Sequence, residues 1–341
     1  MANAVYRVWN PKEYLKAGPT DIVELLPVPG HHPLFLVKWV VDTLVYGIVH
    51  REIIHLSGPT GTAKSSLLEA LYLVPENFRA VCEGLGFSAL PLKLYAIEMC
   101  KFETPGELYS RRALKAASTF DEKSCLIEAL EDAAGSSGSF FPLIWLREIG
   151  RCHSASVQSG LLNLMFKGDI ILPDGRRLNG EEIAWVADSN YQAEHEAVHT
   201  LVTLDTALKR RFTINLTLNY LSAAQEAMIL EYLLRRGHSY GGNGIINKEL
   251  IMKIVELGGL IRQQQTEGNL RSVPPPTIYG YQAFLRMAQN LRHLSLPQVA
   301  LATLLGNASL EDQQVAAGVL NQVFGLRTSQ EDDSTLWGHL F

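Results

Sequence analysis

An eight-residue stretch, GPTGTAKS at Gly58–Ser65, constrains the fold of this chain more than any other feature of its sequence. It matches the phosphate-loop pattern G-x-x-x-x-G-K-[ST] at every anchor position except one, where Ala63 replaces the second glycine. The β-rich run Arg51–Leu56 precedes the loop, and a helical pattern at Ser65–Leu73 follows it. Because the motif requires a strand, a loop and a helix in this order, the sequence predicts a phosphate-binding loop here. A glycine-rich turn that merely joins a strand to a helix is the alternative.

The chemistry of this loop divides between its backbone and two side chains. Backbone N–H groups of such a loop point at phosphate oxygens near the start of a helix. Lys64 adds a positive charge for the β and γ phosphates of a nucleotide, and the hydroxyl of Ser65 is the predicted ligand of Mg²⁺. Ala63 costs about 1 kcal/mol or more if its φ is positive. The predicted nucleotide-contacting residues are Gly58, Pro59, Thr60, Gly61, Thr62, Ala63, Lys64, Ser65 and Ser66.

Hydrophobic periodicity predicts two structural parts. As far as Tyr220, short apolar runs typical of buried strands alternate with helical patterns, which predicts a mostly parallel sheet with helices on both faces. These runs are Leu92–Ile97, Leu143–Leu146, Ile183–Ala187 and Phe212–Leu216. Beyond Tyr220 the periodic segments are helical, namely Ala223–Arg236, Asn247–Leu260, Tyr281–His293 and Leu296–Leu305. The predicted fold class is therefore α/β, followed by an all-helical domain.

The predicted domain boundaries follow these changes of pattern. Residues 1–33 are punctuated by prolines, and we expect an N-terminal extension with little regular structure. A helix at Leu34–Tyr46 opens the α/β domain, which covers residues 34–220. The helical domain covers residues 221–327, and an acidic, polar tail covers residues 328–341.

Charge and composition exclude several classes of protein. The 30 Lys and Arg against 35 Asp and Glu give a net charge of −5, which argues against nucleic-acid binding through bulk positive charge. The four cysteines form no C-x-x-C pair, which favours a reducing compartment. The most apolar stretch, Leu34–Val49, is interrupted by Lys38 and Asp42 and is too short for a membrane span. We therefore expect a soluble cytoplasmic protein without a membrane span. Nucleic-acid binding is disfavoured, and a local basic patch is the alternative that stays open.

A second set of motifs occupies Phe141–Tyr220. The apolar run FPLIWL leads into Arg147-Glu148, a Leu-Pro-Asp-Gly turn follows, VADSNY contains Asn190, and LDTALKRRF contains Arg211. With the phosphate loop, this order of motifs resembles the AAA+ ATPases of the MoxR-like branch, which is related to dynein and midasin. The resemblance runs from about Leu34 to Leu305. It implies a P-loop NTPase core with a helical lid domain, and ATP and Mg²⁺ as cofactors.

The resemblance also implies roles for individual residues. Glu148 matches the carboxylate that polarises the attacking water, and Asn190 matches the sensor that positions this water against the γ-phosphate. Arg211 matches the arginine finger, which acts on the nucleotide of the neighbouring subunit and therefore implies a closed ring, commonly of six subunits.

Arg147 departs from the family pattern, because it stands where the family has the aspartate that supports Mg²⁺. A cation there opposes Mg²⁺ by like-charge repulsion, so hydrolysis is expected to be slow. Arg147 either turns away and leaves a weakened metal site or contacts a phosphate itself. An ordinary surface ion pair, with the strand shifted by one residue, is the third possibility.

Two further features leave alternatives open. In the helical domain Tyr279 stands near the place of the family's nucleotide-sensing arginine, and either Arg271 or Arg286 could compensate. The segment HEAVH at His195–His199 matches the H-E-x-x-H zinc pattern literally, although a zinc protease also needs a third ligand and an open pocket.

The leading functional expectation is a homo-oligomeric ring ATPase that couples ATP binding and slow hydrolysis to the remodelling of a client protein. In the family such clients often carry a von Willebrand A domain, and the Lys167–Arg177 hairpin is the expected contact element. The first alternative is a nucleotide-bound scaffold that barely cleaves ATP. It could be one subunit of a mixed ring in which the other subunits supply hydrolysis. The second is a zinc hydrolase built on HEAVH.

Overall fold

The computed structural model describes residues 4–115, 118–136, 138–152, 154–190, 204–236 and 246–325. Contacts divide the chain into two compact units. The larger unit comprises residues 6–192 and 197–219, and the smaller comprises residues 220–341 together with 1–5 and 193–196. Each unit has a hydrophobic core of its own.

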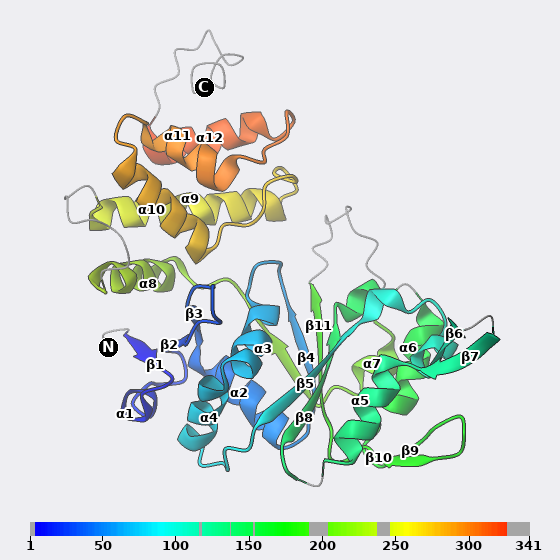
Figure 1. Cartoon of the computed structure of the whole chain (residues 1–341). Coiled ribbons are helices and arrows are strands. Elements are labelled where there is room, and N and C mark those ends of the chain that lie inside the picture. The colour runs from blue at the N-terminus through cyan, green and yellow to red at the C-terminus, as the bar shows by residue number, and fades with distance from the viewer. Residues whose placement is uncertain are drawn as a thin grey trace. The chain divides into compact units, whose positions relative to one another are not determined.

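A five-stranded sheet forms the centre of the larger unit (Figure 1). Each neighbouring pair of its strands is parallel, which confirms the predicted parallel sheet. The strands of such a sheet are covered on both faces, and this is why they appear in the sequence as continuous apolar runs. The strand order is β12 (Ile214–Thr217), β4 (Ile53–Gly58), β11 (Ala184–Asn190), β8 (Phe141–Arg147) and β5 (Leu92–Glu98).

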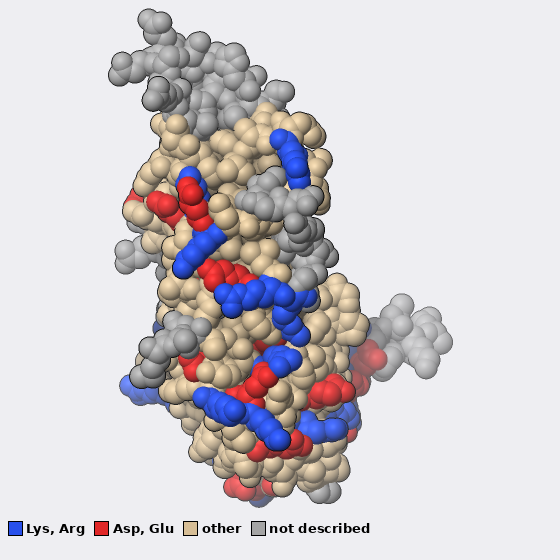
Figure 2. Space-filling model, turned by 90° about the vertical axis from the view of Figure 1, so that its left-hand side faces the viewer, with Lys and Arg blue, Asp and Glu red and all other residues tan. Residues whose placement is uncertain are grey.

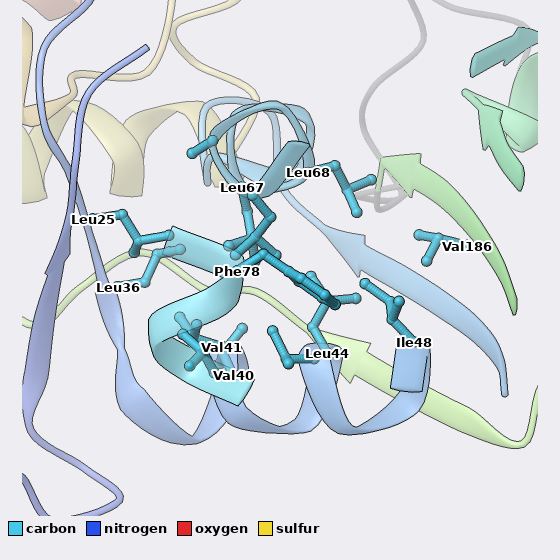
Figure 3. Packing of buried hydrophobic residues seen from close by; sticks show 14 of the residues in the cluster. Leu25, Leu36, Val40, Val41, Leu44, Ile48, Leu67, Leu68, Phe78 and Val186 are labelled. Carbon is cyan, nitrogen blue, oxygen red and sulfur yellow. The ribbon is translucent and has the colours of Figure 1, made fainter. Parts of the chain in front are cut away.

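Two helical layers cover the two faces of this sheet. Side chains that alternate along β4, β8 and β11 belong to two different hydrophobic clusters, as the period of two along a strand requires. Figure 3 shows the first cluster, to which Leu44, Leu67 and Phe78 contribute from three helices and Val186 from strand β11. The helices of this first layer are α2 (Lys38–Val49), α3 (Lys64–Leu73) and α4 (Pro75–Gly84). The second layer contains α5 (Cys125–Ala134), α6 (Ala155–Leu164) and α7 (Thr206–Lys209).

The N-terminal segment differs from its prediction. Residues 1–33 were expected to have little regular structure, but they contribute two strands of a three-stranded sheet and a short helix. The expected helix at Leu34–Tyr46 instead begins at Lys38 and continues to Val49, because the first four expected residues pair with β2 as a strand. Prolines that punctuate this segment separate its short elements without preventing them. The elements are β1 (Val5–Arg7), α1 (Pro11–Tyr14), β2 (Ile22–Leu25) and β3 (Leu34–Val37).

The larger unit also contains two antiparallel hairpins. The hairpin expected at Lys167–Arg177 is present as β9 (Asp169–Ile171) and β10 (Arg177–Asn179), with Gly175 at a φ of +83° in its turn. The other hairpin, β6 (Ser110–Lys115) and β7 (Ser118–Lys123), was not predicted. Short 3-10 turns complete the unit at η1 (Met99–Lys101), η2 (Pro105–Leu108) and η3 (Ile149–Arg151).

The smaller unit is helical throughout residues 220–236 and 246–325, apart from its connections. Within this unit, the guanidinium carbon of Arg262 lies 4.4 Å from the centre of the Tyr220 ring, and its Nη2 lies 2.6 Å from Glu226 Oε1. The four predicted helices are present, and the last continues as a π-helical turn; α12 was not predicted. The elements are α8 (Ala223–Arg235), α9 (Lys248–Thr266), α10 (Ile278–Asn290), α11 (Leu296–Ala300), η4 (Leu301–Leu305) and α12 (Gln313–Phe324).

Candidate functional site

The predicted phosphate loop joins β4 to α3 in a strained backbone conformation. Gly58, Gly61 and Ala63 have φ values of +146°, +82° and +69°. A Cβ on Gly58 would lie 2.1 Å from the carbonyl oxygen of Leu218, so only glycine fits there. Ala63 is left-handed, which meets the condition under which its methyl group costs about 1 kcal/mol. Strain of this kind persists where the surrounding structure imposes it, often at a binding site.

Lys64 is buried within this loop, with only 6% of its surface exposed. Its Nζ donates hydrogen bonds to the carbonyl oxygens of Gly58 and Pro59 at 2.9 and 2.8 Å. Thr62 Oγ1 donates to the same Pro59 oxygen at 2.9 Å. The loop is thus curled around its own lysine, and no side chain caps the N-terminus of α3. An uncapped helix N-terminus beside a buried cation is a favourable place for an anion.

The parallel sheet brings two more predicted residues to the edge that carries the loop. Asn190 is paired in register with Gly58, and Leu146 is paired with Ala187 of the same strand β11. Arg147 and Glu148 therefore emerge from β8 beside the last residues of β11. The structure thus places Glu148 and Asn190 at the carboxyl edge of the sheet, next to the loop.

Glu148 lies in a left-handed turn, with φ of +51° and ψ of +50°. Its backbone N–H donates to Asp188 Oδ1 at 3.2 Å, and its carboxylate pairs with Arg151 at 3.0 Å. The side chain is 36% exposed, so this ion pair is weak, worth at most about 1 kcal/mol. The carboxylate is therefore accessible to water at the sheet edge once Arg151 turns away.

Arg147 points away from the loop strand. Its Nη1 lies 2.8 Å from Glu98 Oε1 at the end of the edge strand β5, and its guanidinium carbon lies 4.7 Å from the centre of the Trp145 ring. Of the expected arrangements, this is the one in which Arg147 turns away, and it includes the surface ion pair of the third possibility. Glu98 is paired in register with Arg147.

Asp188 is a buried carboxylate that the sequence analysis did not single out. It lies on β11, is 4% exposed, and accepts a hydrogen bond from Trp145 Nε1 at 2.6 Å. Burial raises the pKa of this carboxyl, the nearby charge of Glu148 raises it further, and the charge of Lys64 lowers it. An acid at the end of the apolar run WVAD was the signal that could have identified it.

Arg211 lies at the opposite end of the strands, where the amino ends of β4 and β12 lie side by side. The backbone N–H of Thr213 bonds to the Ile53 carbonyl oxygen, which places Arg211 beside the start of β4. Gly58 is five positions beyond Ile53, which is about 17 Å along a strand. The guanidinium carbon of Arg211 lies 5.3 Å from the centre of the Phe166 ring. The structure therefore does not bring Arg211 to the phosphate loop of its own chain.

The other features of the sequence contribute little to this site. HEAVH at His195–His199 lies outside the described residues, and within the described ranges no three His, Cys, Asp or Glu gather as a metal site. Tyr279 is in the first turn of α10. On the face drawn in Figure 2, Lys and Arg are interspersed with Asp and Glu. In the part of the chain that the structure describes, no helix is long and apolar enough for a membrane span.

Comparison with known proteins gives little further guidance. No family model matches the chain, and neither does any curated protein. Among solved structures, a candidate ATPase from Cytophaga hutchinsonii is 18% identical, with 83% of this chain and 88% of that chain covered and a TM-score of 0.39. A likeness at that score carries no argument about function. The function must therefore be argued from the loop and the sheet edge beside it.

Proposed function

We propose that this chain is an ATP-binding AAA+ ring ATPase of the MoxR-like kind, which couples nucleotide binding and slow hydrolysis to the remodelling of a partner protein. One observation carries the proposal. The strained loop with its buried Lys64, the uncapped N-terminus of α3 and the polar residues Glu148 and Asn190 meet at one edge of a parallel sheet. Open α/β sheets bind ligands at this edge.

The residues present fit a nucleotide and its cation. Backbone N–H groups of Gly58–Ser65 would hold the phosphates, and Lys64 would exchange two carbonyl partners for phosphate oxygens. Mg²⁺ takes oxygen ligands and keeps several waters, so Ser65, half-buried in the first turn of α3, suits it. Arg147 does not suit it, because a guanidinium repels the cation. Bound Mg²⁺ would neutralise charge that develops on the phosphates.

Slow hydrolysis is proposed because the residues expected to act on water and on the metal are engaged in other ion pairs. Glu148, the proposed base, is paired with Arg151, and the position of the family's Mg²⁺-supporting aspartate is occupied by Arg147. Asn190 would orient the attacking water from the end of β11. Each pair must rearrange before water is polarised in line with the γ-phosphate.

A ring is proposed from the position of Arg211. An arginine about 17 Å from its own loop can serve a phosphate site only across an interface. The proposed assembly is a homo-oligomer, six subunits being the family's common number, with the helical unit acting as a lid. The β9–β10 hairpin would contact the client, for which a von Willebrand A domain is the proposed type.

A scaffold that binds ATP without cleaving it is the second candidate. The observation that favours it is the pairing of both Arg147 and Glu148 with other charged side chains. ATP turnover by the assembled ring distinguishes the two functions, since the scaffold would bind ATP with no release of phosphate above background.

Lys64→Ala tests the proposed nucleotide site. The variant loses a charge-assisted contact worth about 1.5–3 kcal/mol, so ATP affinity should fall about ten- to a hundredfold in titration calorimetry. Lys93→Ala is the matched control, because Lys93 is an exposed lysine paired with Asp132 on the edge strand β5. An ATP affinity that is the same in wild type and in Lys64→Ala would refute the proposed site.

A further inference from the structure

Three carboxylates lie at the loop-bearing edge of the sheet, and they differ in their partners. Glu98 is paired with Arg147, and Glu148 is paired with Arg151. Asp188 has no such counter-ion at salt-bridge distance among the described residues, and both of its hydrogen bonds, from Trp145 and from the Glu148 backbone, use Oδ1. Neither of these hydrogen bonds uses Oδ2, and the side chain as a whole is 4% exposed.

The register of the sheet places Asp188 closer to the phosphate loop than Arg147. β11 pairs directly with the loop strand β4, with Asp188 opposite Leu56 and two residues before the Asn190–Gly58 pair. β8 lies one strand further away. Residues paired in a parallel sheet point to the same face, so Asp188 shares the face of Leu56, which is in the hydrophobic cluster that contains Leu67 of α3.

The electrostatics of Asp188 favour a positive charge beside it. A buried carboxylate is costly unless a positive charge or several hydrogen bonds compensate it. Lys64 is close enough to lower the pKa of Asp188, and its Nζ also donates to the carbonyl oxygens of Gly58 and Pro59. When phosphates draw Lys64 toward them, the negative charge on Asp188 needs another positive partner.

We propose that Asp188 holds the hydrated divalent cation that accompanies a bound nucleotide, in place of a carboxylate at position 147. The acidic group has thus moved from β8 to the adjacent strand β11, and Arg147 is free to pair with Glu98. This inference rests on the proposed nucleotide site. It names Asp188 as the residue that makes nucleotide affinity depend on the metal.

The test is the metal dependence of nucleotide binding by the full chain, which needs no turnover. ADP affinity is measured by calorimetry with Mg²⁺ and again with EDTA, and Mn²⁺ paramagnetic resonance reports the metal directly. Wild type should bind ADP more tightly with Mg²⁺. In Asp188→Asn the ratio of ADP affinity with Mg²⁺ to that with EDTA should fall at least tenfold. Its ADP affinity in EDTA should stay the same or rise, because a negative charge is removed.

Two variants separate metal binding from a structural role of Asp188. Trp145→Phe removes the donor to Oδ1 and keeps the carboxylate, so it should retain the metal-dependent gain whatever its effect on the melting temperature. Adding Arg147→Asp to Asp188→Asn should restore part of the gain. If Asp188→Asn fails to fold, Asp188→Ser removes the charge with a smaller side chain, and a full metal-dependent gain in that variant would overturn the proposal.

The remaining outcomes distinguish the two proposals. An undiminished gain in Asp188→Asn, or an equal loss of affinity in EDTA, would show that Asp188 shapes the loop and not the metal site. ADP binding by wild type with no effect of Mg²⁺ would overturn the inference and leave the nucleotide site intact. No ADP binding by wild type at millimolar concentration would overturn both.

Discussion

On the proposed function, replacing Arg147 by aspartate should raise the rate of ATP turnover by the proposed ring about fivefold. Two unit charges about 8 Å apart, at an effective dielectric of about 20, interact by about 2 kcal/mol. The Arg147 and Glu98 side chains are 36% and 30% exposed, so solvent screening should halve this figure at least. A gain of about 1 kcal/mol in transition-state stabilisation corresponds to about fivefold in rate. The lost ion pair with Glu98 should cost at most about 1 kcal/mol of folding stability.

Three comparison variants define what this result means. Arg147→Ala removes the cation without adding an acid, and should therefore give a smaller gain than Arg147→Asp. Glu148→Gln combined with Arg147→Asp should abolish the gain, because the proposed base is then absent. Glu98→Gln removes only the ion pair and should not reproduce the gain in turnover. Phosphate release under steady state, with nucleotide affinity measured alongside, provides the assay. A well-folded Arg147→Asp ring that binds ATP but has no turnover would refute the reasoning, since Arg147 would then act on a phosphate itself.

Two further predictions concern the loop and the ring. Gly58→Ala would set a Cβ against the Leu218 carbonyl oxygen at 2.1 Å, so it should abolish detectable nucleotide binding by calorimetry, whereas Gly86→Ala, at another positive φ but in open space, should retain it. Arg211→Ala should leave ATP affinity within about twofold and lower turnover at least tenfold, as expected for a residue that supports phosphoryl transfer from a neighbouring subunit. If a strictly monomeric preparation hydrolyses ATP as fast as the assembled one, Arg211 does not act across an interface.

Local patterns were sufficient to predict the phosphate loop and the five strands of the central sheet. Each strand appears as an apolar run, because a parallel strand is buried on both faces. The N-terminal sheet was missed because its strands are three or four residues long, and β3 runs directly into α2, so its apolar residues continue the helical pattern. Length decides between strand and helix only when the boundary between them is visible in the sequence.

The partners of the site residues could not be predicted in this way. The pairing of Arg147 with Glu98 depends on β5 lying beside β8, and the place of Asp188 depends on β11 lying between β4 and β8. Both are consequences of strand order, which no local pattern contains. In particular, a single acid at the end of WVAD has no meaning until the neighbouring strands are known.

The resting contacts of the site bear on how fast the protein could work. Lys64 is held by two loop carbonyls, Glu148 by Arg151, and Arg211 by the ring of Phe166. Each exchange costs only the net value of a hydrogen bond or a half-exposed pair, about 1 kcal/mol, because a phosphate or a water replaces the lost partner. Such costs slow a reaction by about fivefold each and do not forbid it. The proposed limit on hydrolysis therefore lies more in the charge at position 147 and in the assembly that must supply Arg211 than in the contacts of Lys64 and Glu148.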